Sequence, residues 1–335
     1  MELLPGAAEE IANEVRRRGA AIPAAHGERS LHVDMTNWLR VVGERLVVKV
    51  AAEPGSLDRS TKIWDLLSGH AIAPVLYGWL DEDGWVSATV SEFIPDSTDG
   101  WTWAVDDVLE WLSGGDPPQW PAEVGALIAR MHLRLSDGAS GVPGALESRA
   151  RNALAAAADL KNPWVDARAD QLNEIISELP NDPVGPVFPI HGDLHVGQIL
   201  RFSGGYRVLD FDGDPTLTRA ERDQSDTAAR DVAHLLVSID MVASVAQRRL
   251  GRRSIDVLRW ADSAQRALIA AYNARARALL DERLLPGLQV EQLLRELIYA
   301  DGFLPEWRYA AEGALAHRFP ITEEQPWTPP DSLTI

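Results

Sequence analysis

A loop-and-strand segment at residues 189–214 constrains the fold of this chain more than any other stretch. It begins with apolar residues that lead into the run His-Gly-Asp-Leu-His. The glycine of this run predicts a turn, and Asp193 follows it. Gln198 follows five residues later, and a hairpin signal then leads into a strand-like run that ends at Asp210. The pattern predicts that one loop carboxylate, one amide and the further carboxylates of Asp210 and Asp212 lie close together.

Phosphoryl transfer from a nucleotide requires this set of residue types. One aspartate orients the attacking hydroxyl and accepts its proton, while an amide and an aspartate hold the magnesium ions that bridge the phosphates. The signature H-R-D-L-x-x-x-N followed by D-F-G fits the segment, with Gln198 where Asn is expected and Asp212 where Gly is expected. We therefore predict Asp193 as the catalytic base, with Mg²⁺ held by Gln198, Asp210 and Asp212.

The form H-G-D-L-H followed by L-D-F-D-G-D resembles the small-molecule branch of the protein-kinase fold. That branch includes aminoglycoside phosphotransferases and the actinobacterial kinases that act on maltose or glucosamine. The resemblance implies an α+β, protein-kinase-like fold of two lobes, a small antiparallel β lobe followed by a mainly α-helical lobe. It also implies ATP as the phosphate donor and Mg²⁺ as the cofactor.

Other interpretations of the segment were weighed against this one. An isolated His-Gly-Asp is commonly a turn with a capping aspartate, and G-D-L-H also begins the first metal cluster of metallophosphoesterases. A metallophosphoesterase would need a downstream G-N-H-[DE] motif and further histidine ligands, whereas this chain has eight histidines and no such motif. Within the segment, His191 is expected to brace the loop by hydrogen bonding. His195 is either a group that faces the phosphates or acceptor, or a satisfied loop histidine.

The first 95 residues contain several strand-like runs and a helical run, a pattern typical of a small antiparallel sheet. Lys49 stands near the end of a β-branched run, as the lysine of V-A-I-K does in kinases, and is one of only three lysines. We expect its ammonium group to pair with the nucleotide phosphates, although a strand lysine is otherwise a common solvated residue. After a short helix over residues 9–18, the strand-like runs are 31–33, 38–42, 45–50, 75–80 and 85–93, and the helical run among them is 57–67.

Two parts of this region depart from protein kinases. The helical run offers no glutamate to Lys49, so that Asp65 or Glu53 is the nearest substitute. No G-x-G-x-x-G motif lies between the first strands, which leaves Thr36 and Asn37 in the turn there as candidates for capping the phosphates.

The last strand-like run leaves the sheet through Glu92, Phe93 and Ile94, whose backbone is expected to bind adenine. A stretch rich in Ser, Thr, Asp and Gly follows and indicates a hinge between lobes. The predicted domains are a nucleotide-binding lobe over residues 1–95 and a catalytic and acceptor-binding lobe over residues 96–335.

Candidate acceptor-binding residues are scattered over the second lobe. The run Arg-Asp-Val-Ala around Asp231 resembles the matching helix of sugar kinases, which implies acceptor binding by Asp231, or a buried aspartate that fixes the catalytic loop. Sugars are commonly held by an aromatic platform with carboxylates on the hydroxyls, and Asp301 and Trp307 lie in a segment rich in both residue types. With 12 tryptophans in the chain, packing is the alternative for Trp307. Asp193 and His195 complete the predicted acceptor set.

The composition of the chain limits the kinds of molecule that it is expected to bind. A net charge of −18 disfavours nucleic acid, which needs a basic face, and suits a neutral or cationic acceptor, although an acidic surface also serves solubility. No apolar run approaches the ~18 residues of a membrane span, the first residues do not form a signal peptide, and the chain has no cysteine. We therefore expect a cytoplasmic protein without a membrane or nucleic-acid partner.

The acceptor is predicted to be an amino sugar such as glucosamine, because an acidic protein favours a cationic substrate. An aminoglycoside antibiotic would use the same catalytic residues, and maltose is disfavoured by the lack of a long N-terminal cap region. A pseudokinase that binds nucleotide or sugar without turnover is the remaining alternative.

Overall fold

The backbone of the protein, seen in a computed structural model, falls into two compact units. The structure describes residues 4–31, 37–137, 139, 146–180, 185–321 and 327–330. Unit 1 comprises residues 1–98, 191–193 and 198–224, and unit 2 comprises residues 99–190, 194–197 and 225–335. The chain therefore crosses from one unit to the other within the predicted catalytic loop, and neither unit is one continuous stretch.

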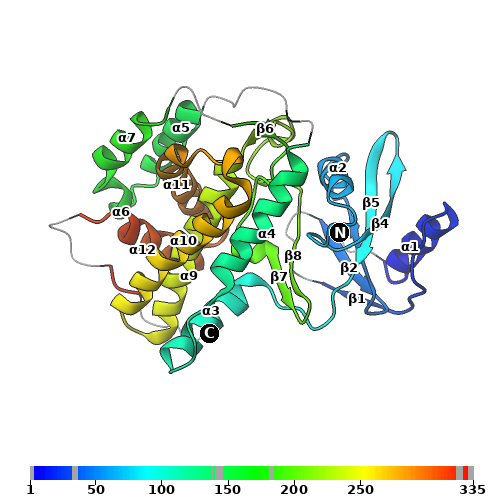
Figure 1. Cartoon of the computed structure of the whole chain (residues 1–335). Helices are drawn as coiled ribbons and strands as arrows, with labels where there is room; N and C mark the ends of the chain where they lie inside the picture. The colour runs from blue at the N-terminus through cyan, green and yellow to red at the C-terminus, as the bar shows by residue number, and fades with distance from the viewer. Residues whose placement is uncertain are drawn as a thin grey trace. The chain divides into compact units, whose positions relative to one another are not determined.

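Unit 1 is built on a five-stranded antiparallel sheet in the order β1-β2-β3-β5-β4. Leu46 and Val48 of β3 point to one face, where they pack with α1. Because side chains alternate along a strand, Lys49 points to the opposite face, and Figure 1 shows α1 and α2 on opposite sides of the sheet. The elements are α1 (Ala7–Arg17), β1 (Glu28–Ser30), β2 (Trp38–Val42), β3 (Leu46–Val50), α2 (Asp58–Leu66), β4 (Leu76–Glu82) and β5 (Trp85–Glu92).

The later part of unit 1 is a hairpin and the loop that follows it. Arg201 of the first hairpin strand and Thr98 exchange two backbone hydrogen bonds of 2.9 Å, and the Val208 amide donates to the Ile72 carbonyl at 2.8 Å. These bonds attach the hairpin to the first part of the unit. Its elements are a 3₁₀ turn η1 (Val196–Gln198) that leads in from unit 2, β7 (Ile199–Phe202), β8 (Gly205–Val208) and α8 (Arg219–Arg222).

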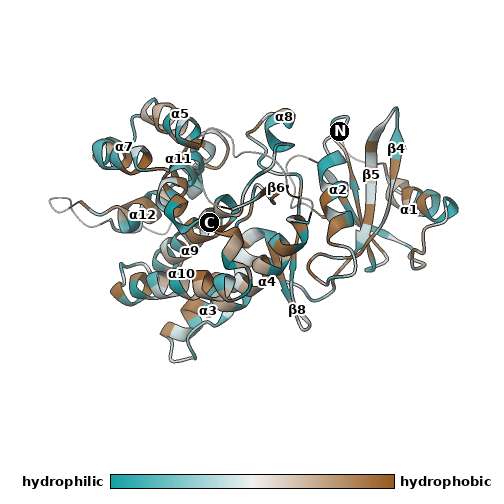
Figure 2. Ribbon diagram, turned by 45° about the horizontal axis from the view of Figure 1, so that its top comes forward, coloured by the Kyte–Doolittle hydropathy of each residue, from teal (hydrophilic) through white to brown (hydrophobic). Residues whose placement is uncertain are grey.

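Unit 2 is mainly helical and is organised around α9. Residues 228–247 of this helix are all buried, and α3, α10, α11 and α12 pack against it. Figure 2 shows hydrophilic and hydrophobic residues on both α5 and α7, as expected of helices with one face on the core and one in solvent. The elements are α3 (Gly100–Leu112), α4 (Trp120–Leu135), α5 (Leu146–Ala158), α6 (Pro163–Asp166), α7 (Ala169–Ser177), β6 (Val187–Phe188), β9 (Asp226–Thr227), α9 (Ala228–Leu250), α10 (Ile255–Ala276), η2 (Arg277–Leu279), η3 (Glu282–Leu284), α11 (Leu285–Phe303), η4 (Pro305–Trp307) and α12 (Arg308–Arg318).

The α+β composition confirms the predicted fold class, with the sheet in unit 1 and most helices in unit 2. Four of the five predicted strands correspond to β2, β3, β4 and β5 with ends that agree within two residues, and the fifth, over residues 31–33, lies largely outside the described residues. Among the helices of the described ranges, none combines the length and apolar character needed to cross a membrane. The division into a nucleotide-binding lobe over 1–95 and an acceptor-binding lobe over 96–335 stays a prediction, because the compact units reflect backbone proximity and not ligand binding.

Candidate active site

The centre of the candidate site in unit 1 is the ammonium group of Lys49. Its Nζ lies 2.9 Å from Asp210 Oδ1 and 2.6 Å from Asp212 Oδ2. The Asn37 side-chain amide donates to the same Asp212 oxygen at 3.0 Å. The structure thus brings two side chains near the start of the chain together with two that lie more than 150 residues later, and all four were predicted to bind nucleotide or metal. The carboxylates that meet Lys49 come from the loop after β8 and not from α2, where Asp65 was considered.

The charges at this centre do not balance. Burial raises the pKa of Asp212 to about 6, since the opposing Lys49 ammonium is shared with a second carboxylate. Burial acts in the same direction on Asp210, whose side chain is 34 % exposed, but there Lys49 prevails and holds the pKa below its usual range. One cation therefore faces two carboxylates, and above about pH 6 the group carries a net negative charge.

The backbone around Asp210 is unusual for a residue with a side chain. Asp210 has a φ of 54°, in the left-handed region that residues other than glycine seldom occupy. The preceding amide of Leu209 donates to the carbonyl of Gln198 at 2.8 Å, which places the Gln198 backbone beside this loop. Such strain persists where the surroundings fix it, and it concentrates at functional sites.

The oxygen atoms at this centre fit a magnesium ion. Asp212 Oδ1 is buried and has no hydrogen-bond partner among the residues that the structure describes. No group of three or more His, Cys, Asp or Glu side chains in the described part of the chain is arranged to hold a metal. Mg²⁺ is usually bound by one or two carboxylates together with phosphate oxygens and water, and not by a cage made only of protein. The pair Asp210 and Asp212, with the nearby Gln198, is a donor set of that kind.

The loop that carries Asp193 is braced by His191, as predicted. The His191 ring is fully buried, and its Nε2 donates to the Leu209 carbonyl at 2.7 Å. Its Nδ1 accepts from the Asp193 amide at 3.2 Å. Because one ring nitrogen donates and the other accepts, a neutral imidazole satisfies both bonds. His191 thus holds the backbone of the base and the backbone next to Asp210, while the Asp193 side chain stays partly exposed.

The predicted adenine-binding backbone uses several of its groups within the sheet. The Glu92 amide donates to the Val75 carbonyl and the Phe93 amide to the Arg45 carbonyl, both at 2.8 Å. Ile94 is buried. Adenine binding at Glu92–Ile94 stays a prediction and would use other backbone groups. Thr36 lies outside the described residues.

In unit 2 the structure reveals a cluster of aromatic and polar side chains around His195. The His195 ring stacks on Trp101, with centroids 5.6 Å apart, and lies 5.5 Å from the ring of His234. Trp307 packs against Trp101 at 5.5 Å, and His234 Nε2 lies 3.0 Å from Glu296 Oε1. We call these five residues the His195 cluster. It contains two of the predicted acceptor-binding residues.

Glu296 gives the His195 cluster its charge. Burial raises the pKa of Glu296, but the hydrogen bond from His234 and the nearby His195 outweigh it, so that the pKa is lowered and the carboxylate is ionised. Sequence analysis missed Glu296, His234 and Trp101. They stand in three different helices, α3, α9 and α11, and nothing in the sequence links these helices.

Asp231 and Asp301, also predicted to bind the acceptor, have surroundings different from those of the His195 cluster. Asp231 is 1 % exposed, and its carboxylate lies 3.0 Å from Nε2 of the buried His132, whose Nδ1 bonds to the Tyr272 hydroxyl at 2.8 Å. This burial argues against the predicted acceptor contact and favours the structural alternative. Asp301 is exposed and forms an ion pair with Arg308 at 3.2 Å.

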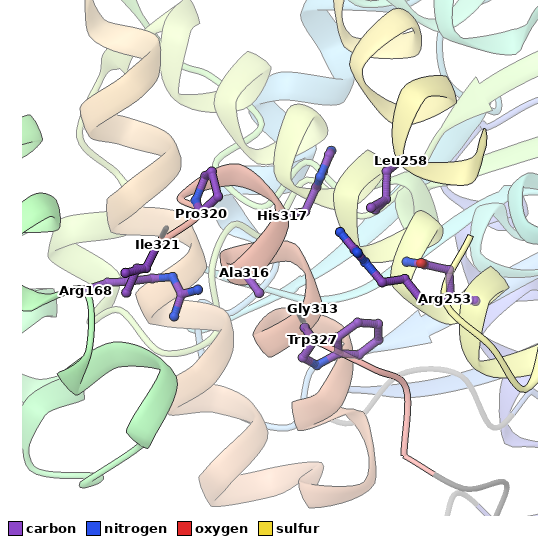
Figure 3. Close-up of a pocket in the computed structure, with 10 residues that line it drawn as sticks. Arg168, Arg253, Leu258, Gly313, Ala316, His317, Pro320, Ile321 and Trp327 are labelled. Atoms are coloured by element: carbon purple, nitrogen blue, oxygen red, sulfur yellow. The ribbon is translucent and has the colours of Figure 1, made fainter. Parts of the chain in front are cut away.

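A cavity in unit 2, shown in Figure 3, is not the predicted site. It has a volume of about 140 Å³, and none of the residues predicted for nucleotide, metal or acceptor binding lines it. Its lining residues are Arg168, Gln247, Arg253, Leu258, Gly313, Ala316, His317, Pro320, Ile321 and Trp327.

Arg59, on α2, is a further residue that sequence analysis missed. It is 9 % exposed, and its guanidinium group binds the backbone carbonyls of His191, Phe211 and Arg222. An arginine in an amphipathic helix carries no signal for bonds to carbonyls more than 130 residues away.

Comparison with known proteins finds one matching family and similar relatives. Residues 29–213 match the phosphotransferase enzyme family, and this range contains Lys49, Asp193, Asp210 and Asp212. A curated relative, a glucosamine kinase from Streptacidiphilus jiangxiensis, is 33 % identical over 94 % of this chain and 81 % of its own length.

Solved structures agree on the fold. A glucosamine kinase in complex with glucosamine, ADP and inorganic phosphate has a TM-score of 0.81 and 34 % identity, covering 93 % of this chain and 85 % of its own. An aminoglycoside phosphotransferase in complex with GDP and kanamycin has a TM-score of 0.56 and 13 % identity, covering 88 % of this chain and 94 % of its own. This second likeness shows the fold alone, and both confirm the predicted kinase-like architecture.

Proposed function

We propose that this chain, which belongs to the phosphotransferase enzyme family, transfers the γ-phosphate of ATP to a hydroxyl group of glucosamine. The similarity to glucosamine kinases carries the proposal, because 33 % and 34 % identity extend over more than 90 % of this chain. The fold is shared with an aminoglycoside phosphotransferase at only 13 % identity, which gives no support for an antibiotic acceptor. ADP in the similar structure supports ATP as the donor, and a donor of this kind fits the predicted cytoplasmic location.

The phosphates of ATP are bound by the centre around Lys49. Lys49 pairs with the phosphate oxygens, and Asp210, Asp212 and Gln198 hold Mg²⁺. When bound, Mg²⁺ would supply positive charge that offsets the negative charge of the transferred group. The two carboxylates that share the single Lys49 ammonium group support this assignment.

Asp193 acts as the base. As the acceptor oxygen bonds to the γ-phosphorus, the bond from that phosphorus to the β–γ bridging oxygen breaks, and the hydroxyl proton passes to the Asp193 carboxylate. ADP carries away the electron pair of the broken bond. Little covalent work falls to the protein, so correct placement of Asp193 supplies much of the rate enhancement.

Acceptor binding is assigned to the His195 cluster. Trp101 and Trp307 offer aromatic surface for a sugar ring, and the ionised Glu296 suits the ammonium group of an amino sugar. The net charge of −18 also favours a cationic acceptor over a neutral one. Asp301, exposed and close in sequence to Trp307, is a further candidate.

The proposal is tested by measuring ADP release from Mg-ATP with glucosamine, glucose, maltose and kanamycin as acceptors. We expect turnover with glucosamine to exceed that with glucose by at least about tenfold in kcat/KM, since the ammonium group gains an ionic contact. A preference for kanamycin or maltose would replace glucosamine as the acceptor. Nucleotide binding without turnover of any acceptor would instead indicate a pseudokinase.

A further inference from the structure

The guanidinium group of Arg59 links two loops that carry the proposed catalytic side chains. Its Nη1 donates to the His191 carbonyl at 3.1 Å and also to the Phe211 carbonyl. Its Nε donates to the Arg222 carbonyl at 2.8 Å. One nitrogen therefore bridges the loop before Asp193 and the loop that contains Asp212.

The bridged carbonyls stand next to the functional residues in the sequence. The His191 carbonyl is separated from Asp193 by one glycine, and the Phe211 carbonyl belongs to the peptide bond that leads into Asp212. Because a single nitrogen binds both oxygens, the two backbones cannot shift apart without the loss of a charge-assisted hydrogen bond. Arg59 therefore helps to set the distance between the loop that carries Asp193 and the loop that carries Asp210 and Asp212.

The helix that carries Arg59 is itself anchored. Asp58 at its first turn accepts a hydrogen bond from the Val86 amide at 2.8 Å and pairs with Arg219 at 2.7 Å. The Arg59 side chain thus extends from a fixed point beside the sheet, and its planar group with several donors can hold several carbonyls at once.

Two glycines with positive φ lie next to the guanidinium group. Gly192 and Gly213 have φ values of 85° and 80°, and a Cβ atom at either position would lie 3.4 Å from an Arg59 nitrogen. Both loops thus fold closely around the charged group. Burial of a cation is tolerated here because carbonyl oxygens satisfy its hydrogen bonds.

We propose that Arg59 is a positioning residue for phosphoryl transfer, holding the Asp193 loop and the Asp210–Asp212 loop in register through their backbone carbonyls. The inference rests on the proposed function for its effect on turnover, whereas its effect on the loops does not depend on the acceptor. The helix α2 contains no glutamate that could pair with Lys49. It is linked to the two catalytic loops through Arg59 instead.

The variants Arg59→Met and Arg59→Lys test the proposal, with Arg168→Met as the matched control. Arg168 is 1 % exposed and also binds backbone carbonyls, those of Phe319 at 2.7 Å and Trp164 at 3.0 Å, within unit 2. Both methionine variants therefore lose a buried guanidinium group that binds carbonyls. Only the Arg59 variant loses one that binds the two loops.

Two measurements separate positioning from stability. In steady-state assays we expect Arg59→Met to lower kcat roughly 10²-fold with a small change in the KM for ATP, and Arg59→Lys to lie between it and the wild type. In hydrogen-exchange measurements without ligand, we expect the backbone amides of residues 189–194 and 209–214 to exchange about tenfold faster in Arg59→Met than in the wild type. Arg168→Met is expected to lower Tm while leaving kcat and both loops unchanged.

Wild-type kcat in Arg59→Met, or wild-type exchange in both loops, would overturn the proposal. An equal loss of kcat in Arg168→Met would also overturn it, because general destabilisation would then explain the effect. If Arg59→Met does not fold, the same criteria apply to Arg59→Lys. A wild-type protein without turnover on any acceptor would contradict the proposed function, and the exchange data would still decide whether Arg59 holds the loops.

Discussion

Two buried ion networks, one in each unit, are built from similar groups and differ in charge balance. Around Lys49 a single cation meets Asp210 and Asp212. In unit 2, Arg230 meets Asp226 at 2.6 Å and Glu291 at 2.9 Å, and Arg149 lies 2.8 Å from the same Asp226. That second network has two cations for two carboxylates, and the first has one.

The difference appears in the pKa values. Although burial opposes ionisation of Asp226, Arg230 and Arg149 lower its pKa, whereas the pKa of Asp212 rises to about 6. An atom without a hydrogen bond does not distinguish the networks, because Glu291 Oε2 is as unpartnered as Asp212 Oδ1. Charge balance does distinguish them. The network of Arg230 is complete as it stands, and the centre around Lys49 favours a further cation.

The largest effect is expected from Asp193→Asn. Loss of the base should lower kcat by about 10²–10⁴-fold with Tm nearly unchanged, because the side chain is partly exposed and the amide keeps its shape. ADP release and thermal unfolding are the two measurements. Undiminished turnover would show that Asp193 is not the base. The Lys49 centre would then lack the neighbouring base that makes it a phosphotransfer site.

The paired variants Lys49→Met and Arg230→Met test the comparison directly. Arg230→Met leaves two carboxylates buried beside one remaining cation and should cost about 3–5 kcal/mol of unfolding free energy. Lys49→Met should cost less, since Asp212 can take up a proton, but should lower kcat by about 10²-fold through lost phosphate binding. Urea unfolding and ADP release measure the two effects. Equal losses of stability would show that charge balance does not separate the networks.

The two networks should respond to pH in opposite directions. Asp226 has a lowered pKa, so its contribution to stability is present above its usual pKa and is lost as pH falls through the folded value. Asp212 has a raised pKa, so its contribution is present below about 3.8 and is lost as pH rises through about 6. In metal-free buffer, Asp212→Asn should therefore gain roughly 1–3 kcal/mol relative to wild type between pH 4 and 7. Asp226→Asn should lose stability at neutral pH, and urea unfolding across this range checks both signs.

The smallest effect on stability is expected from Asp301→Asn. The Asp301–Arg308 pair is exposed, with side chains 43 % and 46 % accessible, so its loss should change the unfolding free energy by less than about 0.5 kcal/mol. The KM for glucosamine should nevertheless rise several-fold if Asp301 contacts the acceptor. An unchanged KM would leave acceptor recognition to the His195 cluster.

Much of unit 1 could be predicted because its signals are local in sequence. The alternation around Lys49 and the turns between strands fix β2 to β5, and the two aspartate motifs each lie on one short loop. The meeting of Lys49 with Asp210 and Asp212 was implied by resemblance to kinases, which supplied the long-range information. Spacing alone does not relate residues 161 positions apart.

The contacts that sequence analysis missed join side chains to distant partners with no characteristic pattern. Arg59 binds backbone carbonyls, which every residue possesses, so its partners leave no mark in the sequence. Glu296 and His234 meet only because α9 and α11 pack together. Asp231 was predicted either to bind the acceptor or to fix the catalytic loop as a buried aspartate, and its burial depends on how the neighbouring helices assemble around α9.

The way in which the chain alternates between the two units has a consequence for how the protein can be divided. Lys49 is encoded in the first 98 residues, whereas Asp210 and Asp212 come from residues 198–224 of the same unit. A truncated fragment ending at the first crossing would keep the lysine and lose both of its carboxylates. No single cut separates the two units, because unit 1 is drawn from three stretches of the chain and unit 2 from three others.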